Sequence, residues 1–329
     1  MEILALPFFQ RALVAAILSG LLAPSVGTYI VQKRLSLLGD GLGHVAIMGV
    51  GFALMTGQSP LPVAVVTAIA GAIVVELLRQ SGKASGDLGL AILFYGGLAA
   101  GVLMAGVAGQ GAAGLSGYLF GSLTSVTTSD IAVIVVLAVI LMVCTIGLAP
   151  RLFAVSVDEE YSQVLGLKAR WLNLLIVVLA AVAVTVSMRT VGLLLISALM
   201  IIPVATAQQL FVSFKGTFFG SMGIGALAAV VGTFASFYLD TATGATIVVT
   251  AIVFLGVAWT LGRFVKRTDR FVPYIEDHGR HPHEPAEPHD DSHALPKIRA
   301  GKVIQHGDHY DYIHDGHRHA VHGDHYDEH

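Results

Sequence analysis

Charge is scarce in this chain, and cysteine is nearly absent. Only 12% of the 329 residues are Asp, Glu, Lys or Arg, 55% are hydrophobic, and Cys144 is the single cysteine. A soluble domain of this length needs much more polar surface, so a water-soluble globular fold is excluded. One cysteine cannot form an intrachain disulfide, which excludes a disulfide framework. The composition indicates a membrane protein, because a bilayer solvates apolar surface.

The scarcity of charge is confined to the first part of the chain. Residues 1–267 contain nine acidic side chains, thirteen Lys or Arg, and one histidine, His44. Residues 268–329 contain thirteen acidic side chains, six Lys or Arg, and thirteen of the fourteen histidines. We therefore predict two units, a transmembrane domain at 1–267 and a His- and Asp-rich tail at 268–329. The tail has too few apolar residues to form a core, so we predict that it is disordered.

An α-helix needs about 20 mostly apolar residues to cross a bilayer. Nine stretches meet this requirement: 8–31, 38–56, 60–79, 88–108, 130–149, 171–188, 191–211, 218–238 and 244–262. Glycine and polar residues interrupt the second and the seventh, so eight spans remain the alternative. The predicted fold class is all-α, a polytopic bundle of transmembrane helices.

Three local features accompany the predicted spans. The polar loop between the fourth and fifth spans favours a short interfacial helix around Tyr118–Leu123. Pro203 lacks a backbone donor and is expected to kink or end the seventh span. The weakly apolar residues 205–216 then form an amphipathic turn.

Basic residues mark alternate loops, and such residues favour the cytoplasmic side. They follow the first, third, fifth, seventh and ninth spans, and include Lys33, Arg34, Arg79, Lys83, Arg151, Lys168, Arg170, Lys215, Arg263, Lys266 and Arg267. Arg189 is the main exception. This pattern predicts an external N-terminus and a cytoplasmic tail; with eight spans the N-terminus moves inside and the tail stays in the cytoplasm.

The candidate metal-binding pair in the membrane is Asp40 and His44, in L-G-D-G-L-G-H-V-A-I-M-G. A spacing of four places both side chains on one helix face. Carboxylate and imidazole are ligands for Zn²⁺ or Mn²⁺, and ionisable groups at membrane depth are usually functional. The alternative is structural, with Asp40 capping backbone amides and His44 packed beside it.

Catalytic machinery is missing from the sequence. No G-x-x-x-x-G-K-[ST] phosphate-binding loop occurs, and the longest internal loop has about 20 residues. We predict that the chain is not an enzyme, has no permanent cofactor, and depends on a separate ATPase chain for any ATP-driven activity. Glu76 and Arg79 are predicted to form an interfacial ion pair.

The tail contains the densest cluster of metal ligands. H-G-D-H-Y occurs at 306–310 and 322–326, and H-x-x-H-x-H lies between them. Such a density of His and Asp favours divalent metal, and imidazole suits Zn²⁺. A solvated tail that binds metal only adventitiously is the alternative. The predicted tail ligands are His306, His309, His314, His317, His319, His322 and His325.

Four ordered segments resemble the zinc/manganese-type permeases of metal-ion ABC transporters. They are K-R-L-S-L-L-G-D-G-L-G-H-V-A-I-M-G-V, D-E-E-Y-S-Q-V-L-G-L, V-G-L-L-L-I-S-A-L-M-I-I-P-V-A-T-A and S-F-Y-L-D-T-A-T-G-A-T-I-V. They cover residues 1 to about 265; Ala242 in the last replaces a common proline. The tail pieces resemble the zinc-binding histidine-triad repeats of streptococcal surface proteins, which lie outside the cell.

The resemblance implies a homodimeric permease for zinc or manganese in a bacterial cytoplasmic membrane. It implies a cytoplasmic ATPase subunit, an external metal-binding lipoprotein, contact with membrane lipid, and no nucleic-acid partner. It also implies that Asp40 and His44 meet metal in the pathway. The ATPase-docking residues implied are Ala207, Gln208, Gln209, Lys215 and Gly216, with residues 157–167 as the next candidate.

Two other functions compete with the ABC permease. A stand-alone secondary transporter or channel needs its own coupling charges at mid-membrane, and few charges remain there beyond Asp40 and His44. A membrane-anchored metal buffer, in which the tail is the functional part, does not need nine spans.

Overall fold

The computed structural model describes residues 6–81, 86–121, 126–189 and 191–264 and, in the tail, 302–306, 309–314, 317–322 and 325–328. The chain divides into two units, Met1–Arg267 and Thr268–His329. Each is described separately.

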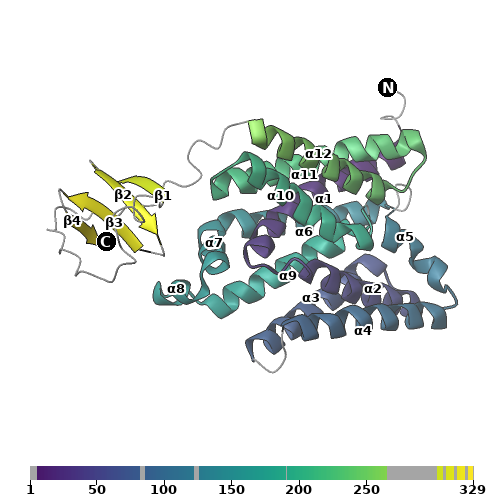
Figure 1. Cartoon of the computed structure of the whole chain (residues 1–329). Helices are drawn as coiled ribbons and strands as arrows, with labels where there is room; N and C mark the ends of the chain where they lie inside the picture. The colour runs from purple at the N-terminus through teal and green to yellow at the C-terminus, as the bar shows by residue number, and fades with distance from the viewer. Residues whose placement is uncertain are drawn as a thin grey trace. The chain divides into compact units, whose positions relative to one another are not determined.

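The first unit is a bundle of α-helices (Figure 1). Its elements are α1 (Pro7–Gln32), α2 (Leu38–Thr56), α3 (Pro60–Gln80), α4 (Gly86–Val107), η2 (Ala112–Leu115), α5 (Ser116–Phe120), α6 (Thr128–Gly147), α7 (Ala149–Val157), α8 (Glu159–Val164), α9 (Ala169–Ser187), α10 (Leu193–Leu210), α11 (Phe214–Leu239) and α12 (Thr243–Phe264). The predicted helical bundle is confirmed.

Eight helices in the described part of the chain are long and apolar enough to cross a membrane: α1, α2, α3, α4, α6, α9, α11 and α12. The predicted stretch 191–211 forms α10, whose apolar part, Leu195–Leu210, is shorter than a full span. By length and composition, the structure therefore supports the alternative count of eight.

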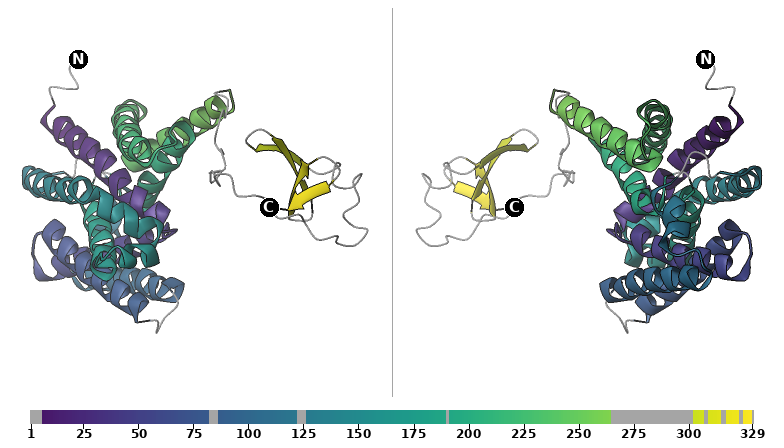
Figure 2. Two further views of the ribbon diagram at one scale, coloured as in Figure 1. Left: turned by 90° about the vertical axis from the view of Figure 1, so that its left-hand side faces the viewer. Right: turned by 90° about the vertical axis from the view of Figure 1, so that its right-hand side faces the viewer.

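Helices α1 and α2 are the most deeply buried of the eight candidate spans. Helix α1 packs against α9, α10 and α11, and α2 packs against α3, α4, α9 and α10; Figure 2 gives two side views of this arrangement. Glycines bring α1 and α11 together, since a Cβ on Gly20 would lie 2.5 Å from the Gly225 carbonyl oxygen. Small residues allow such close backbone approach between membrane helices.

Three boundaries differ from the sequence-based expectations. Pro203 lies inside α10, which continues to Leu210. Helix α11 begins at Phe214, where Ser213 accepts a hydrogen bond from the Gly216 amide at 3.1 Å. The expected amphipathic turn at 205–216 is therefore wrong: two helices meet there, joined by residues 211–213.

The expected short helix near Tyr118 is present as α5, preceded by η2.

The helix ends alternate between two ends of the bundle. At one end, Lys33 after α1 donates to the Val155 carbonyl at 3.1 Å, and Gln80 on α3 donates to the Arg170 carbonyl at 3.2 Å. At the other end Arg189 forms an ion pair with Asp130, and both side chains are nearly buried. Arg189 is the exception to the pattern of basic loops. Its ion pair with Asp130 gives this exception a structural explanation.

The described residues of the second unit form a four-stranded antiparallel sheet in the order β1-β2-β3-β4. The strands are β1 (Lys302–His306), β2 (His309–His314), β3 (His317–His322) and β4 (His325–Glu328). These strands differ from the disorder predicted for the tail. Aromatic and β-branched residues favour strands, and the Gly-Asp or Asp-Gly pairs between them are typical of two-residue hairpin turns. Residues 268–301 lie outside the described residues.

Candidate functional site

Asp40 and His44 lie one turn apart in the first half of α2. The Nδ1 atom of His44 lies 2.7 Å from the Asp40 backbone carbonyl oxygen. A carbonyl only accepts, so Nδ1 carries the proton and Nε2 keeps a lone pair for another partner. His44 is only 4% exposed. The Nδ1 hydrogen bond therefore fixes the ring orientation and leaves Nε2 as the nitrogen that can meet a metal ion.

The Asp40 carboxylate is held by a different helix. The Ser197 hydroxyl on α10 donates a 2.5 Å hydrogen bond to Asp40 Oδ1. One carboxylate oxygen is thereby oriented, and Oδ2 stays available. Sequence reasoning missed Ser197, although its signal was present as a polar side chain within the apolar run L-L-L-I-S-A-L-M.

Glycines on α2 and α4 let the neighbouring helices approach the site closely. A Cβ on Gly43 would lie 2.3 Å from Leu193 Cδ1 on α10, and one on Gly97 of α4 would lie 2.7 Å from the His44 carbonyl oxygen. At both positions a neighbouring helix therefore packs directly against the glycine. At Gly43 the structure shows tight packing of α2 against α10.

A hollow of about 220 Å³ lies beside the site, between α2 and α4. Asp40 is the only carboxylate in its lining, and Phe94, which also lines it, packs against His44 with a ring-centroid distance of 3.9 Å. The lining residues are Leu37, Asp40, Gly41, Leu90, Ala91, Phe94 and Tyr95. Leu37 and Tyr95 at its edge are 67% and 71% exposed, so the hollow opens onto the outer face of the bundle.

The outer face of α4 is apolar and exposed. Ile92, Leu103 and Val107 are 63%, 67% and 70% exposed, respectively. Among the residues whose side chains the structure describes, no group of three or more His, Cys, Asp or Glu is placed to hold a metal ion. Among the helices that the structure describes, Asp40 and His44 therefore form a pair of ligand side chains beside an apolar surface.

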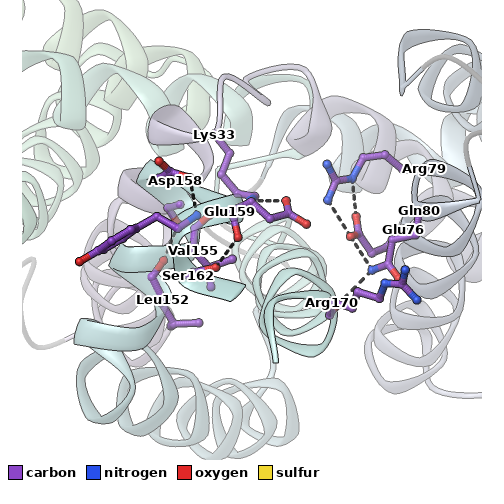
Figure 3. A network of polar contacts seen from close by, with 12 residues as sticks. Lys33, Glu76, Arg79, Gln80, Leu152, Val155, Asp158, Glu159, Ser162 and Arg170 are labelled. Atoms are coloured by element: carbon purple, nitrogen blue, oxygen red, sulfur yellow. Dashed lines mark hydrogen bonds and ion pairs between the residues drawn. The ribbon is translucent and has the colours of Figure 1, made fainter. Parts of the chain in front are cut away.

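A polar network gathers at the end of the bundle that carries Lys33 and Arg79 (Figure 3). Arg79 donates two 2.8 Å hydrogen bonds to the carboxylate of Glu76, which is 1% exposed. The predicted Glu76–Arg79 ion pair is confirmed. Lys33 lies 3.7 Å from Glu159 of α8, and burial lowers the Lys33 pKa while Glu159 partly opposes that shift.

Two surfaces at this end present apolar side chains. At the corner between α10 and α11, Leu210, Phe211 and Val212 are 46%, 41% and 83% exposed. Within the expected docking set, Gln208 and Lys215 are exposed, Gln209 and Gly216 are partly buried, and Ala207 is fully buried and cannot itself contact a partner. The second surface is α8, where Tyr161 and Val164 are 59% and 83% exposed.

The comparison with family models decides which kind of protein carries this arrangement. The model described as the ABC 3 transport family matches residues 5–261. The chain belongs to the ABC 3 transport family. The resemblance indicated by the four sequence motifs is confirmed, and this ABC 3 family chain is a multi-pass membrane protein whose matched region includes Asp40, His44 and Ser197.

Named relatives of this ABC 3 family chain include permeases for two metals. The manganese import system permease protein ScaB of Streptococcus parasanguinis is 30% identical, over 75% of this chain and 88% of the relative. The high-affinity zinc uptake system membrane protein ZnuB of Haemophilus influenzae is 28% identical, over 72% and 91%. The solved structure of PsaBC from Streptococcus pneumoniae in complex with Fab matches with a TM-score of 0.72 and 28% identity, over 78% and 93%.

Proposed function

We propose that this chain is the permease subunit of a bacterial ABC importer for divalent metal, with Zn²⁺ as the substrate. The observation that carries the proposal is the oriented pair at the start of α2. Asp40 lines a hollow that opens outward, and the Nδ1 bond of His44 leaves Nε2 for ligation. The relatives named for zinc and manganese uptake support a metal substrate.

A homodimer completes the metal site in this proposal. Zn²⁺ prefers four ligands, and one chain offers Asp40 and His44. Two copies related by a two-fold axis bring two carboxylates and two imidazoles together. The hollow that Asp40 lines supports this arrangement, because it opens onto the outer face of the bundle, where a second copy can meet it.

Zinc is preferred over manganese because of the ligands. Imidazole nitrogen suits Zn²⁺, whereas carboxylate, carbonyl and water oxygens suit Mn²⁺. The pathway pair contains one imidazole per chain, and the tail contains seven histidines in its described strands. We place the tail in the cytoplasm, on the charge bias of the loops, where it holds or senses arriving zinc.

Transport in proteoliposomes tests the proposal. The chain is reconstituted with its ATPase subunit, and an external metal-binding lipoprotein delivers the metal. We expect zinc to accumulate only with ATP and the ATPase, because the permease sequence contains no phosphate-binding loop. Zinc accumulation without ATP would favour the secondary transporter, and preferential manganese accumulation would reject zinc as the substrate.

We propose that the ATPase docks on the α10–α11 corner around Gln208, Gln209, Lys215 and Gly216. Exposed Phe211 supports this choice, since aromatic residues are enriched at protein interfaces. Helix α8 is the second candidate, because Tyr161 and Val164 expose a comparable apolar patch on a separate short helix.

Substitution at the two docking surfaces separates these candidates. We expect Lys215→Glu to weaken ATPase binding by about tenfold, or about 1.4 kcal/mol, because it places an anion within the docking surface. Tyr161→Ala tests α8 in the same way, and Tyr238→Ala is the control, being 74% exposed near the opposite end of α11. Co-purification of the ATPase with each variant is the measurement. Loss with Tyr161→Ala alone would move docking to α8.

A further inference from the structure

The motif H-G-D-H-Y-D occurs twice in the tail, at 306–311 and 322–327. Each copy spans one hairpin, because His306 pairs with His309 across β1–β2 and His322 pairs with His325 across β3–β4. Directly paired residues lie on the same face of a sheet, as do residues two apart in a strand. Each copy therefore places two histidines and the following aspartate on one face.

The pairing of β2 with β3 puts both copies on the same face. Ala320 pairs with Asp311 on one side and with Asp327 on the other. Extending the β2–β3 register by two residues aligns His309 with His322. One row across the four strands therefore contains only histidines, in the order His306, His309, His322, His325.

The other three histidines of these strands lie on the opposite face. His314 pairs with His317, and His319 pairs with Tyr312. His314 lies an odd number of residues from His309 along β2, and His317 and His319 lie an odd number from His322 along β3. Successive residues of a strand alternate between faces, so residues an odd number apart lie on opposite faces. The sheet therefore divides the histidines between its two faces, and this division cannot be seen from their order in the sequence.

We propose that strands β1–β4 bind two divalent metal ions side by side on the face that carries the histidine row, one at each copy of the motif. Each copy places two histidines and one aspartate on this face, residue types that suit Zn²⁺. These residues are His306, His309 and Asp311 in one copy and His322, His325 and Asp327 in the other. Neighbouring strands lie about 4.8 Å apart, so the two ions, two strands apart, lie about 10 Å from each other.

This inference deepens the tail-binding part of the proposed function, but it is tested without transport. The probe is Cu²⁺, which binds imidazole sites and is paramagnetic, added to the full-length chain in detergent. We expect magnetic dipolar coupling between two Cu²⁺ ions about 10 Å apart. Excess Zn²⁺ should remove the coupling, because it occupies the same ligands. Acidification below about pH 6 should also remove it, because ligation needs neutral imidazole.

Two double variants make the test specific to the register. His306→Ala/His309→Ala removes one set and should abolish the coupling. His314→Ala/His317→Ala removes the same number of histidines from one hairpin on the opposite face, and should preserve it. Asp311→Asn, a milder change, should lower Cu²⁺ affinity by on the order of tenfold while keeping the strand.

Absence of coupling in the unsubstituted chain would overturn the proposal, as would equal loss in the two double variants. Zinc uptake is measured separately in proteoliposomes. Intact coupling without ATP-driven uptake would reject the transport proposal and leave the two-ion site standing.

Discussion

Replacing His44 by alanine is expected to reduce zinc uptake by at least about a hundredfold. Even groups that only orient a ligand change metal affinity by about 10- to 100-fold, and His44 is proposed as a ligand itself. In a homodimer one substitution removes two of the four ligands. His44→Asn is the companion variant, because its amide nitrogen occupies the position of Nδ1 and can donate to the Asp40 carbonyl but offers no imidazole.

Asp40→Asn separates a ligand from a structural anchor. The asparagine carbonyl still accepts the hydrogen bond from Ser197 on α10, but the carboxylate charge is lost. We expect this variant to insert and assemble normally and to take up no zinc above background in proteoliposomes. Ser197→Ala keeps the charge and loses only the orienting bond, so a smaller loss is expected. Wild-type uptake by both Asp40→Asn and His44→Ala would show that the pair is structural.

The sequence predicts the pair but not how it is held. The spacing of Asp40 and His44 follows from helix geometry alone, because residues four apart share a face. The bond from Ser197 joins residues 157 positions apart, and no local pattern predicts which face of α10 meets α2. The same limit applies to Gly97, whose approach to the His44 backbone depends on the packing of α4.

Pro203 shows why a local rule fails inside a bundle. In an isolated helix, proline removes a hydrogen bond and clashes with the preceding turn, so the sequence predicts a kink or an end. Helix α10 does not end there but continues to Leu210, in contact with α1, α2, α11 and α12; the kink stays a prediction. Packing against neighbouring helices supports such a proline in a membrane protein.

The tail shows the limit of composition, which predicts disorder, while the described residues form strands. Its apolar content is too low for a core, yet Tyr310, Tyr312 and Ile313 favour strands, and Gly-Asp or Asp-Gly pairs separate the strands. The two H-G-D-H-Y copies are visible in the sequence. That they share one face depends on the β2–β3 register, which composition cannot supply.

Gly97→Ala is expected to lower zinc uptake by at least about tenfold without changing any ligand. The new Cβ would lie 2.7 Å from the His44 carbonyl oxygen and 2.9 Å from the Val45 nitrogen. Backbone atoms cannot move aside as a flexible side chain does, so α4 must shift away from α2. Overpacking of this kind costs about 1–3 kcal/mol, and it displaces Phe94 and the hollow beside Asp40.

Gly106→Ala is the matched control for Gly97→Ala. Gly106 lies on the same helix, and no atom lies within 4 Å of an added Cβ. Alanine there raises helix stability by about 0.5–1 kcal/mol, so the two variants should shift thermal stability in opposite directions. Uptake and thermal unfolding in detergent are measured for both. Equal uptake by the two variants would mean that the close approach of α4 to the His44 backbone is not needed for transport.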